Sequence, residues 1–407
     1  MELRRTHNIA EIIRDGVGTP ATLMGWVHHR RDLGQLIFIT LRDRWGELQC
    51  VFDPESNPAA HAVAQDFRAE YVVALTGAAR PRPEKEVREY PGGDREFFVE
   101  SAAVLNAAEP PPFVVEDDVK ASEELRLKHR YLDLRRPYMV NALTLRHKCI
   151  AAIRKYLDGH GFLEIETPLL ARSTPEGARD YVVPSRVQPG KFFALPQSPQ
   201  LFKQILMVSG IDRYFQIAKC LRDEDLRGNR QPEHTQLDLE MSFATRDDLF
   251  VIAEGCMSAV WRECLGLELP TPFPRLTFAE AMDRFGSDKP DLRFGLELVE
   301  LTQIADGIEA NFVKSALESG QRVHGVFVPG ATLSRKQLDE WTEGAKALGA
   351  PGLMTIELSG EGPKGSVGKF VADQLAFAQM AEQQSGESDG TWLMVMGNSR
   401  ANQHVLG

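Results

Sequence analysis

Long apolar segments are missing from this 407-residue chain, which has no uninterrupted run of 18 apolar residues. A helix that crosses a membrane needs about that length. The first residues, MELRRTHNIAE, also lack the apolar core of a secretory signal peptide. We therefore expect a cytoplasmic protein that has no membrane segment.

Cysteine is scarce, and no two cysteines form a C-x-x-C pair. This scattering favours buried thiols in a reducing compartment over a disulfide framework or a zinc site. His28 and His29 are adjacent, with no further His or Cys at the spacing of a metal site, so no metal site is predicted there. The five cysteines are Cys50, Cys149, Cys220, Cys256 and Cys264.

An excess of positive charge is also missing, because the net charge is −11 at pH 7. That balance argues against a generally basic nucleic-acid binder, although a local basic surface is compatible with it. The chain is 43% hydrophobic, and its length is sufficient for two or three domains with their own cores.

The N-terminal region, residues 1–106, contains short apolar-polar alternations typical of strands. Three of them precede a helix-like NPAAHAVAQDF, and two follow it. Five strands with a helix between the third and the fourth indicate an OB-fold β-barrel. The strand-like runs are ATLMGWVHHRR, LIFITLR, ELQCVF, EYVVALTGAA and EFFVESAAVL.

The barrel should present one polar face that carries an aromatic ring. Strand alternation places Phe38 opposite Ile37 and Ile39, and it also turns Gln49 outward, near Arg31. An exposed ring beside an amide and a guanidinium suits stacking and hydrogen bonding with unpaired bases. The alternative is that Phe38 packs beneath a loop.

Composition changes after the barrel. The Pro-rich and acidic AAEPPPFVVEDD marks residues 107–140 as a linker. A mixed helix and strand domain is predicted over 141–285, and a further α/β domain over 286–407.

The stretch LPQSPQLFKQILMVSG predicts a helix with serine as its N-cap and proline in its first turn. Gln200 and Lys203 then share a face near the positive end of that helix. Lys203 is a candidate for holding a substrate carboxylate, and the alternative is a solvated surface lysine. The expected cap is Ser198, and the expected buried side is Leu201, Phe202, Ile205 and Leu206.

Upstream, STPEGARDY places Glu176 in a loop marked by proline and glycine. A carboxylate there can meet a substrate ammonium, but the motif alone is weakly specific.

Residues 213–243, RYFQIAKCLRDEDLRGNRQPEHTQLDLEMSF, predict two antiparallel strands joined by a long charged loop. Each strand has an apolar face and a polar face. The loop exceeds the two to five residues of an ordinary hairpin turn. Arginines at its root can hold a phosphate, whereas a merely solvated loop would not explain the polar face beneath it.

Together these stretches resemble the bacterial-type aspartyl-tRNA synthetases, which are class II enzymes, from about His7 to the last residue. GWVHHRRDLG is similar to their anticodon-binding barrel, GFLEIETPLL to motif 1 and FQIAKCLRDEDLRGNRQPEHTQLDLEMSF to motif 2. TPEGARDY, LPQSPQLFKQ and FGSDKPDLRF resemble the aspartate enzymes in particular. The resemblance implies a multidomain fold, with an OB-fold barrel, an α+β catalytic domain built on an antiparallel sheet, and an α/β GAD-type insertion over 286–407.

Site residues follow from the resemblance by position. Arg222 matches the motif 2 arginine that bridges the α-phosphate of ATP and the aspartate carboxylate, so it is the expected catalytic residue. The loop from Leu226 to His234 should approach the tRNA acceptor end. Three further sets are implied: aspartate-binding Glu176, Ser198, Gln200, Lys203, Arg222 and Asp238; ATP-binding Arg222, Asp223, Glu224 and Gln231; and anticodon-reading Arg31, Phe38 and Gln49.

The implied reaction has two steps. Aspartate attacks the α-phosphate of ATP, with Mg²⁺ helping the polyphosphate to leave, and the adenylate then esterifies the end of tRNA(Asp). Whether tRNA(Asn) is also charged stays open. Motif 1 forms the subunit interface of the family, so the resemblance also implies a homodimer.

The chain departs from the family in one respect. Nothing between Phe243 and Gly407 matches motif 3, the glycine-rich helix start that ends in an ATP-binding arginine. We therefore expect a C-terminally incomplete synthetase whose magnesium ligands belong mainly to the absent part. The alternative is a non-catalytic tRNA-binding protein derived from such an enzyme.

Overall fold

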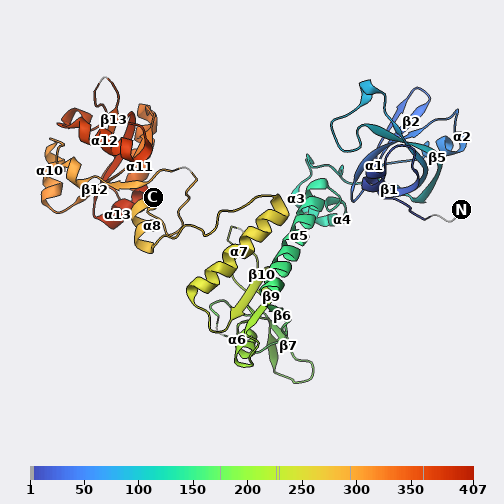
Figure 1. The fold of residues 1–407 in the computed structure, drawn as a ribbon, viewed down its shortest axis with the longest axis horizontal. Coiled ribbons are helices and arrows are strands. Elements are labelled where there is room, and N and C mark those ends of the chain that lie inside the picture. The colour runs from blue at the N-terminus through green and yellow to red at the C-terminus, as the bar shows by residue number, and fades with distance from the viewer. Residues whose placement is uncertain (1–3, 175, 226, 229, 294, 361) are drawn as a thin grey trace. The chain divides into compact units, whose positions relative to one another are not determined.

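The computed structural model describes residues 4–174, 176–225, 227–228, 230–293, 295–360 and 362–407. The chain divides into two compact units, Met1–Pro272 and Phe273–Gly407. Figure 1 colours the chain from blue at the N-terminus to red at the C-terminus.

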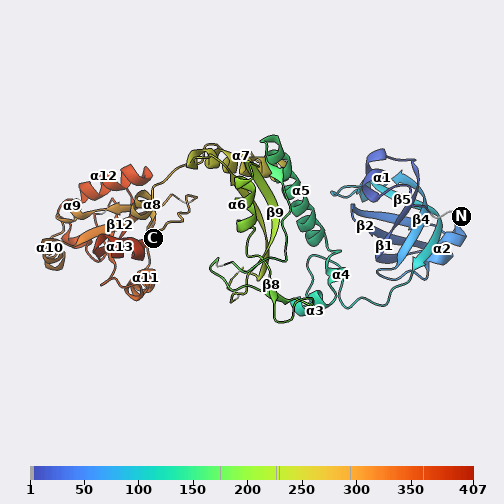
Figure 2. The same ribbon diagram turned by 90° about the horizontal axis from the view of Figure 1, so that it is seen from below.

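The first unit begins with a closed barrel of five strands in the order β1-β2-β3-β5-β4, seen from a second direction in Figure 2. Helix α2 (Pro58–Ala64) lies between β3 and β4 in the sequence, as the alternation predicted. The OB-fold prediction is therefore confirmed. The strands are β1 (Pro20–Leu33), β2 (Leu36–Asp43), β3 (Gly46–Phe52), β4 (Val72–Pro81) and β5 (Arg95–Asn106), with the 3₁₀ turn η1 (Glu84–Glu86) before β5.

Apolar residues fill the barrel, and α1 (Ile9–Asp15) adds Ile9 and Ile12 to its core. This helix has a capping box, in which the Asn8 side chain accepts from the Glu11 N–H and the Glu11 carboxylate accepts from the Asn8 N–H. Strands β4 and β5 approach so closely that a Cβ on Gly77 would lie 1.9 Å from the Phe98 carbonyl oxygen. Glycine is therefore required at that position.

A buried ion pair ties the linker to the barrel. Arg42 Nη2 lies 2.7 Å from Glu70 Oε1, and both side chains are about 5% exposed. Arg135, just before α5, donates to the other oxygen of Glu70 at 2.6 Å and lies over the ring of Trp26. The linker itself contains two short helices, α3 (Glu123–Lys128) and α4 (Arg130–Asp133).

The rest of the first unit is a small sheet with two long helices against its apolar face. The sheet order is β10-β9-β6, with β9 and β10 antiparallel over their full length. Leu157, Phe162, Phe215 and Ile252 form its core. The elements are α5 (Pro137–Gly159), β6 (Leu163–Glu164), β7 (Val182–Pro184), β8 (Phe192–Ala194), α6 (Gln200–Val208), β9 (Arg213–Leu221), β10 (Glu233–Met241) and α7 (Arg246–Leu265).

The second unit is an α/β domain on a four-stranded antiparallel sheet in the order β11-β12-β14-β13. Trp392 is fully buried in its core and donates its indole N–H to the Phe377 carbonyl at 3.2 Å. Its elements are α8 (Phe278–Phe285), β11 (Leu298–Glu300), α9 (Thr302–Ala305), α10 (Asn311–Glu318), β12 (Arg322–Pro329), α11 (Arg335–Ala347), β13 (Met354–Leu358), η2 (Gly368–Phe370), α12 (Gln374–Ser385), β14 (Gly390–Gly397) and α13 (Ser399–Leu406).

The division between the units falls after Pro272, whereas the sequence placed a boundary at 285. Helix α8 explains the difference, because it packs against β11 and α13 of the second unit. Within the part of the chain that is described, no helix combines the length and apolar character needed to cross a membrane.

Candidate active site

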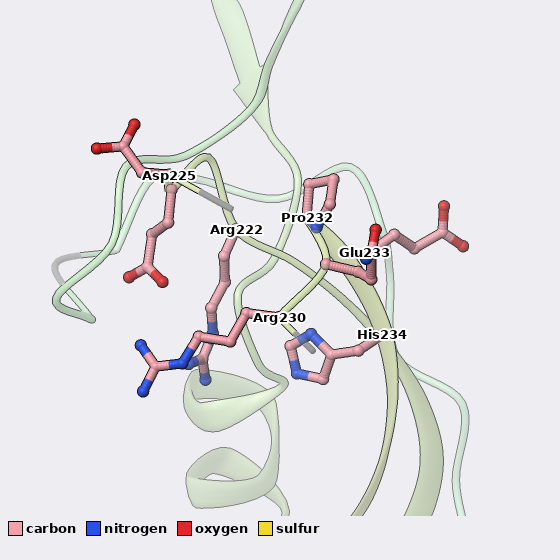
Figure 3. A pocket seen from close by; sticks show the side chains of 8 residues that line it. Arg222, Asp225, Arg230, Pro232, Glu233 and His234 are labelled. Carbon is pink, nitrogen blue, oxygen red and sulfur yellow. The ribbon is translucent and has the colours of Figure 1, made fainter. Parts of the chain in front are cut away.

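The charged loop between β9 and β10 opens at a hydrogen-bonded root. The Arg222 N–H donates to the Pro232 carbonyl at 2.8 Å, and the Asp223 N–H donates to the Arg179 carbonyl at 3.0 Å. A pocket of about 440 Å³ lies beside this root. Figure 3 shows the side chains of Arg222 and Arg230 extending to the same side of it, while Glu233 points away. The pocket is lined by Arg222, Glu224, Asp225, Arg230, Gln231, Pro232, Glu233 and His234.

Arg222 is poised to bind an anion. Its Nε is buried and has no hydrogen-bond partner among the described residues. Leaving a buried guanidinium N–H unsatisfied is costly, so a ligand that accepts from it is favoured. Because guanidinium groups match phosphate and carboxylate oxygens in a fork geometry, Arg222 and Arg230 suit an anionic ligand.

The other residues expected to bind ATP lie around the same loop. Glu224 and Gln231 line the pocket of Arg222, and Asp223 lines an adjacent pocket that shares Glu224 with it. Leu226 and Asn229, both in the predicted tRNA-contacting segment, lie outside the described residues.

Lys203 of α6 faces the polar side of β10. Its Nζ lies 3.0 Å from Asp238 Oδ1 and 3.2 Å from Glu240 Oε2. Burial disfavours the charged ammonium, but hydrogen bonds and Coulombic attraction from the two carboxylates outweigh it and raise the pKa of Lys203. Lys203 is therefore a mostly buried, ion-paired cation, with its side chain 12% exposed, and is not a solvated surface lysine.

Ser198 does not cap the helix as the sequence predicted. Helix α6 begins at Gln200 with Pro199 in the cap position, and the Ser198 hydroxyl donates to Glu176 Oε2 at 2.7 Å. The serine side chain is thus committed to the loop carboxylate instead of to the helix N–H groups. Glu176 and Ser198 line one pocket, while half-buried Gln200 starts the helix beside them.

The apolar side of α6 is also more open than expected. Leu201 is 47% exposed and Ile205 is 60% exposed, so the prediction that both are buried is wrong. Both line the pocket of Glu176 and Ser198, so their side chains border a hollow.

Several of these charges meet around one buried thiol. Burial raises the pKa of Cys220, and the Asp238 carboxylate raises it further. Arg222 opposes this change and Glu176 adds to it. Contacts link the same groups: Gln236 lies between Cys220 and Asp238, with its Oε1 3.9 Å from the sulfur atom and its Nε2 3.1 Å from Asp238 Oδ1. The bridge between Asp223 and Arg179 joins the residue after Arg222 to the loop that carries Glu176.

The structure adds residues that sequence reasoning did not assign to the site. Glu240 is the second carboxylate on Lys203, and its position on the polar face of β10 was the available signal. Arg230 joins Arg222 at the pocket. Gln236 holds the pair in place by donating to Asp238 Oδ1 at 3.1 Å.

The barrel carries a second candidate surface, a pocket of about 750 Å³. Arg31, Phe38 and Gln49 all line it, so the three expected anticodon residues lie together. Phe38 is half-buried, and the Arg31 guanidinium lies 5.3 Å from its ring centroid. The ring borders this pocket and is only partly covered.

Gln49 is held by a charged network behind the ring. Its amide donates to Glu96 Oε1 at 2.5 Å, and Arg82 Nε lies 3.2 Å from the same oxygen. Arg80 contributes a further cation over Phe98 in this pocket. The surface therefore combines an aromatic face with arginines, although the whole chain is acidic.

The fold brings a carboxylate to His28 and His29, which sequence spacing could not show. Their ring nitrogens and a Glu116 oxygen lie within 4.8 Å of one another. However, Arg42 donates to His28 Nδ1 at 2.9 Å, which places the proton of the neutral ring on Nε2. A ring held in that tautomer offers no lone pair toward Glu116, so the cluster is poorly suited to a metal.

The chain is similar to known proteins over most of its length. Residues 122–395 match the family described as tRNA synthetases class II (D, K and N), and residues 21–105 match the OB-fold nucleic acid binding domain. A solved asparaginyl-tRNA synthetase from Pyrococcus horikoshii, in complex with asparaginyl-adenylate, shares the fold. It has a TM-score of 0.61 at 19% identity and covers 99% of this chain and 95% of its own.

Two curated relatives carry the name aspartate-tRNA(Asp/Asn) ligase. The protein of Heliobacterium modesticaldum is 52% identical over 374 residues, and that of Moorella thermoacetica is 53% identical over 370 residues. The matches cover 91% and 90% of this chain, which spans 62% of the length of each relative. With two thirds of its residues within the synthetase match and an OB-fold barrel before it, the chain belongs to the class II tRNA synthetases of the D, K and N group.

Proposed function

We propose that the chain serves an aspartate-tRNA ligase, which activates L-aspartate with ATP and transfers it to tRNA(Asp). The observation that carries this proposal is a set of contacts: Lys203 of α6 pairs with Asp238, Ser198 just before α6 binds Glu176, and Asp223, next to Arg222, is bridged to Arg179 in the loop of Glu176. An acidic amino acid has two carboxylates and one ammonium. Its site therefore requires a cation for each carboxylate and a carboxylate for the ammonium.

Aspartate recognition is assigned to Lys203. An ammonium has three N–H donors, and Asp238 and Glu240 occupy two of them, which leaves one for the substrate side chain. Asparagine presents an amide there and loses a charge-assisted hydrogen bond of about 2 kcal/mol. Glu176, oriented by Ser198, would take the substrate ammonium, with Gln200 beside it.

Activation of aspartate is assigned to Arg222. Its guanidinium would bridge the substrate carboxylate and the α-phosphate of ATP, which is bound as its magnesium complex. The bridge would become stronger as negative charge builds up in the transition state. Asp223, Glu224 and Gln231 would hold the rest of the nucleotide in line.

Transfer requires tRNA at both candidate surfaces. Phe38 would stack on an anticodon base, while Arg31 and Gln49 would contact its phosphate and edge. The names of the relatives include tRNA(Asn) beside tRNA(Asp), so both are proposed as substrates. The reaction is placed in the cytoplasm, where translation consumes charged tRNA.

We also propose a homodimer that uses the exposed apolar side of α5 and the segment after it. Leu143 is 52% exposed on α5, and Leu163, Leu169 and Leu170 are each about half exposed. Exposed apolar side chains that cluster on a surface mark sites of protein–protein contact. Sedimentation at several protein concentrations tests this assembly.

Aspartate-dependent exchange of pyrophosphate into ATP tests the proposed activity. It should be measured with this chain and with a form that includes whatever the gene encodes after Gly407. Exchange with aspartate and not with asparagine supports the proposal. Absence of exchange in both forms, with tRNA binding retained, would favour a non-catalytic tRNA-binding protein.

A further inference from the structure

Gln197 has a buried side chain that no step of the proposed reaction uses. It is 1% exposed and lies immediately before Ser198. Its Oε1 accepts from the Ala178 N–H at 3.1 Å, and its Nε2 donates to the Ala178 carbonyl at 2.9 Å. Nε2 also donates to Asp180 Oδ1 at 2.5 Å.

These partners fix the orientation of the amide. The Ala178 N–H requires an oxygen, and the Ala178 carbonyl together with the Asp180 carboxylate requires an NH₂ group. Gln197 thus pairs with residue 178 as a neighbouring strand would, using a side chain instead of a backbone. If this pairing were broken, the buried side-chain amide of Gln197 would have no hydrogen-bond partners.

A second contact closes the same loop. The Ser173 hydroxyl donates to Asp180 Oδ2 at 2.6 Å, so the segment from 173 to 180 is joined at its base. Hydrogen bonds from Ser173 and Gln197 hold the pKa of Asp180 below its ordinary value. The carboxylate is therefore charged at neutral pH and accepts both bonds.

The loop held in this way carries Glu176. Two adjacent side chains, Gln197 and Ser198, bind the loop at Ala178 and at Glu176 respectively. On its other side, Arg179 is bridged to Asp223 of the charged loop. The bonds to Ala178 therefore hold this loop in place. On one side of Ala178 lies Glu176, which is expected to bind the substrate ammonium, and on the other lies the contact with the charged loop, which is expected to bind phosphate.

We propose that Gln197 is a positioning residue that holds the 173–180 loop so that Glu176 meets the aspartate ammonium. The inference rests on the proposed function, because it assigns a role within the aspartate site. Replacing a residue that only supported folding would change the KM values for aspartate and ATP alike. Replacing a residue that positions Glu176 would change the KM for aspartate.

The test uses the substitution Gln197→Met, which keeps the length of the side chain but removes its hydrogen-bond donor and acceptor. Gln188→Glu and Gln188→Met, at an exposed glutamine in the same domain, are matched controls. Gln197→Glu is a second variant, because it retains an acceptor for the Ala178 N–H but sets a carboxylate against Asp180. Amide hydrogen exchange of the 407-residue chain reports on the loop without requiring activity.

We expect exchange in the 173–180 segment to become roughly tenfold faster in both Gln197 variants, while exchange in the barrel strands stays unchanged. In the form that catalyses pyrophosphate exchange, the KM for aspartate should rise roughly 10-fold or more with the KM for ATP within about threefold. Unchanged loop exchange, or an equal rise of both KM values, would overturn the inference. If the unmodified enzyme fails to exchange pyrophosphate, the proposed function fails, while the loop measurement still decides whether Gln197 holds the loop.

Discussion

The ammonium of Lys203 lies 3.0 Å from Asp238 Oδ1, and the two side chains are 12% and 4% exposed. Asp238 Oδ2 is buried and has no hydrogen-bond partner among the described residues. One oxygen of the carboxylate thus orients the lysine, while the other is left unsatisfied inside the described part of the protein. A cation and an acceptor in one buried pair suit a substrate that itself carries both charges.

Lys203→Met should destabilise the first unit by about 3 kcal/mol, because it leaves Asp238 buried without its counter-charge. Lys219→Met is the control, since that lysine is 58% exposed and lies 3.9 Å from Glu233. It should change the free energy of unfolding by less than about 0.5 kcal/mol. Urea unfolding of both variants measures the difference, and equal losses would contradict a buried pair.

Arg222→Lys should lower the rate of aspartate-dependent pyrophosphate exchange roughly 100-fold or more. Lysine keeps the charge but loses the planar fork that would bridge phosphate and carboxylate. Arg186→Lys, at an exposed arginine of the same domain, should leave the rate unchanged. Full activity of the Arg222 variant would remove that residue from the reaction.

Phe38→Leu should weaken tRNA binding by about 1 kcal/mol or more, which is roughly fivefold, because leucine cannot stack on a base. Aspartate-dependent pyrophosphate exchange should be unaffected, since that step does not use tRNA. Phe192→Leu, at a 61% exposed ring outside the barrel, is the matched control. The tRNA affinity of both variants is measured by fluorescence anisotropy at fixed salt. Equal affinities would argue against stacking at Phe38.

His28 should make the barrel less stable in mild acid. Burial, then the nearby charges of Arg42 and His29, lower its pKa from 6.5 to about 4. The unfolded chain therefore binds the proton more readily, so this contribution to stability is complete above pH 6.5 and declines as the pH falls toward 4.

The expected loss from this group between pH 7 and pH 5 is about 2 kcal/mol. Hydrogen exchange of β1 and β2, corrected for the intrinsic rate, measures it. His28→Gln should reduce the pH dependence, whereas His29→Gln, at an exposed ring, should not. An unchanged pH dependence in the His28 variant would exclude this origin.

Periodicity predicted the parts of the fold in which one strand face is apolar. The barrel and the β9–β10 hairpin followed from alternation, since a period of two places Leu237, Leu239 and Met241 on one side. The same rule placed Asp238 and Glu240 on the other side. It could not show that Lys203 closes over them, because that contact joins separate elements.

Side-chain partners distant in sequence were beyond prediction. Serine before proline indicated a helix cap, but Ser198 donates to Glu176 because the loop brings that carboxylate within reach. Glu116 approaches His29 only because the linker folds back on the barrel. No local pattern reports such pairings, so Gln197 appeared in the sequence as an ordinary polar residue.

The most direct test of the proposed function is aminoacylation by the form that includes any sequence encoded after Gly407. Transcripts whose anticodons read aspartate codons would be offered with L-aspartate or L-asparagine, and ester formation at the tRNA end would be measured. We expect charging with aspartate, a loss of charging in the Arg222→Lys variant and no charging with asparagine. Charging with asparagine, or none with either amino acid, would contradict the proposed function.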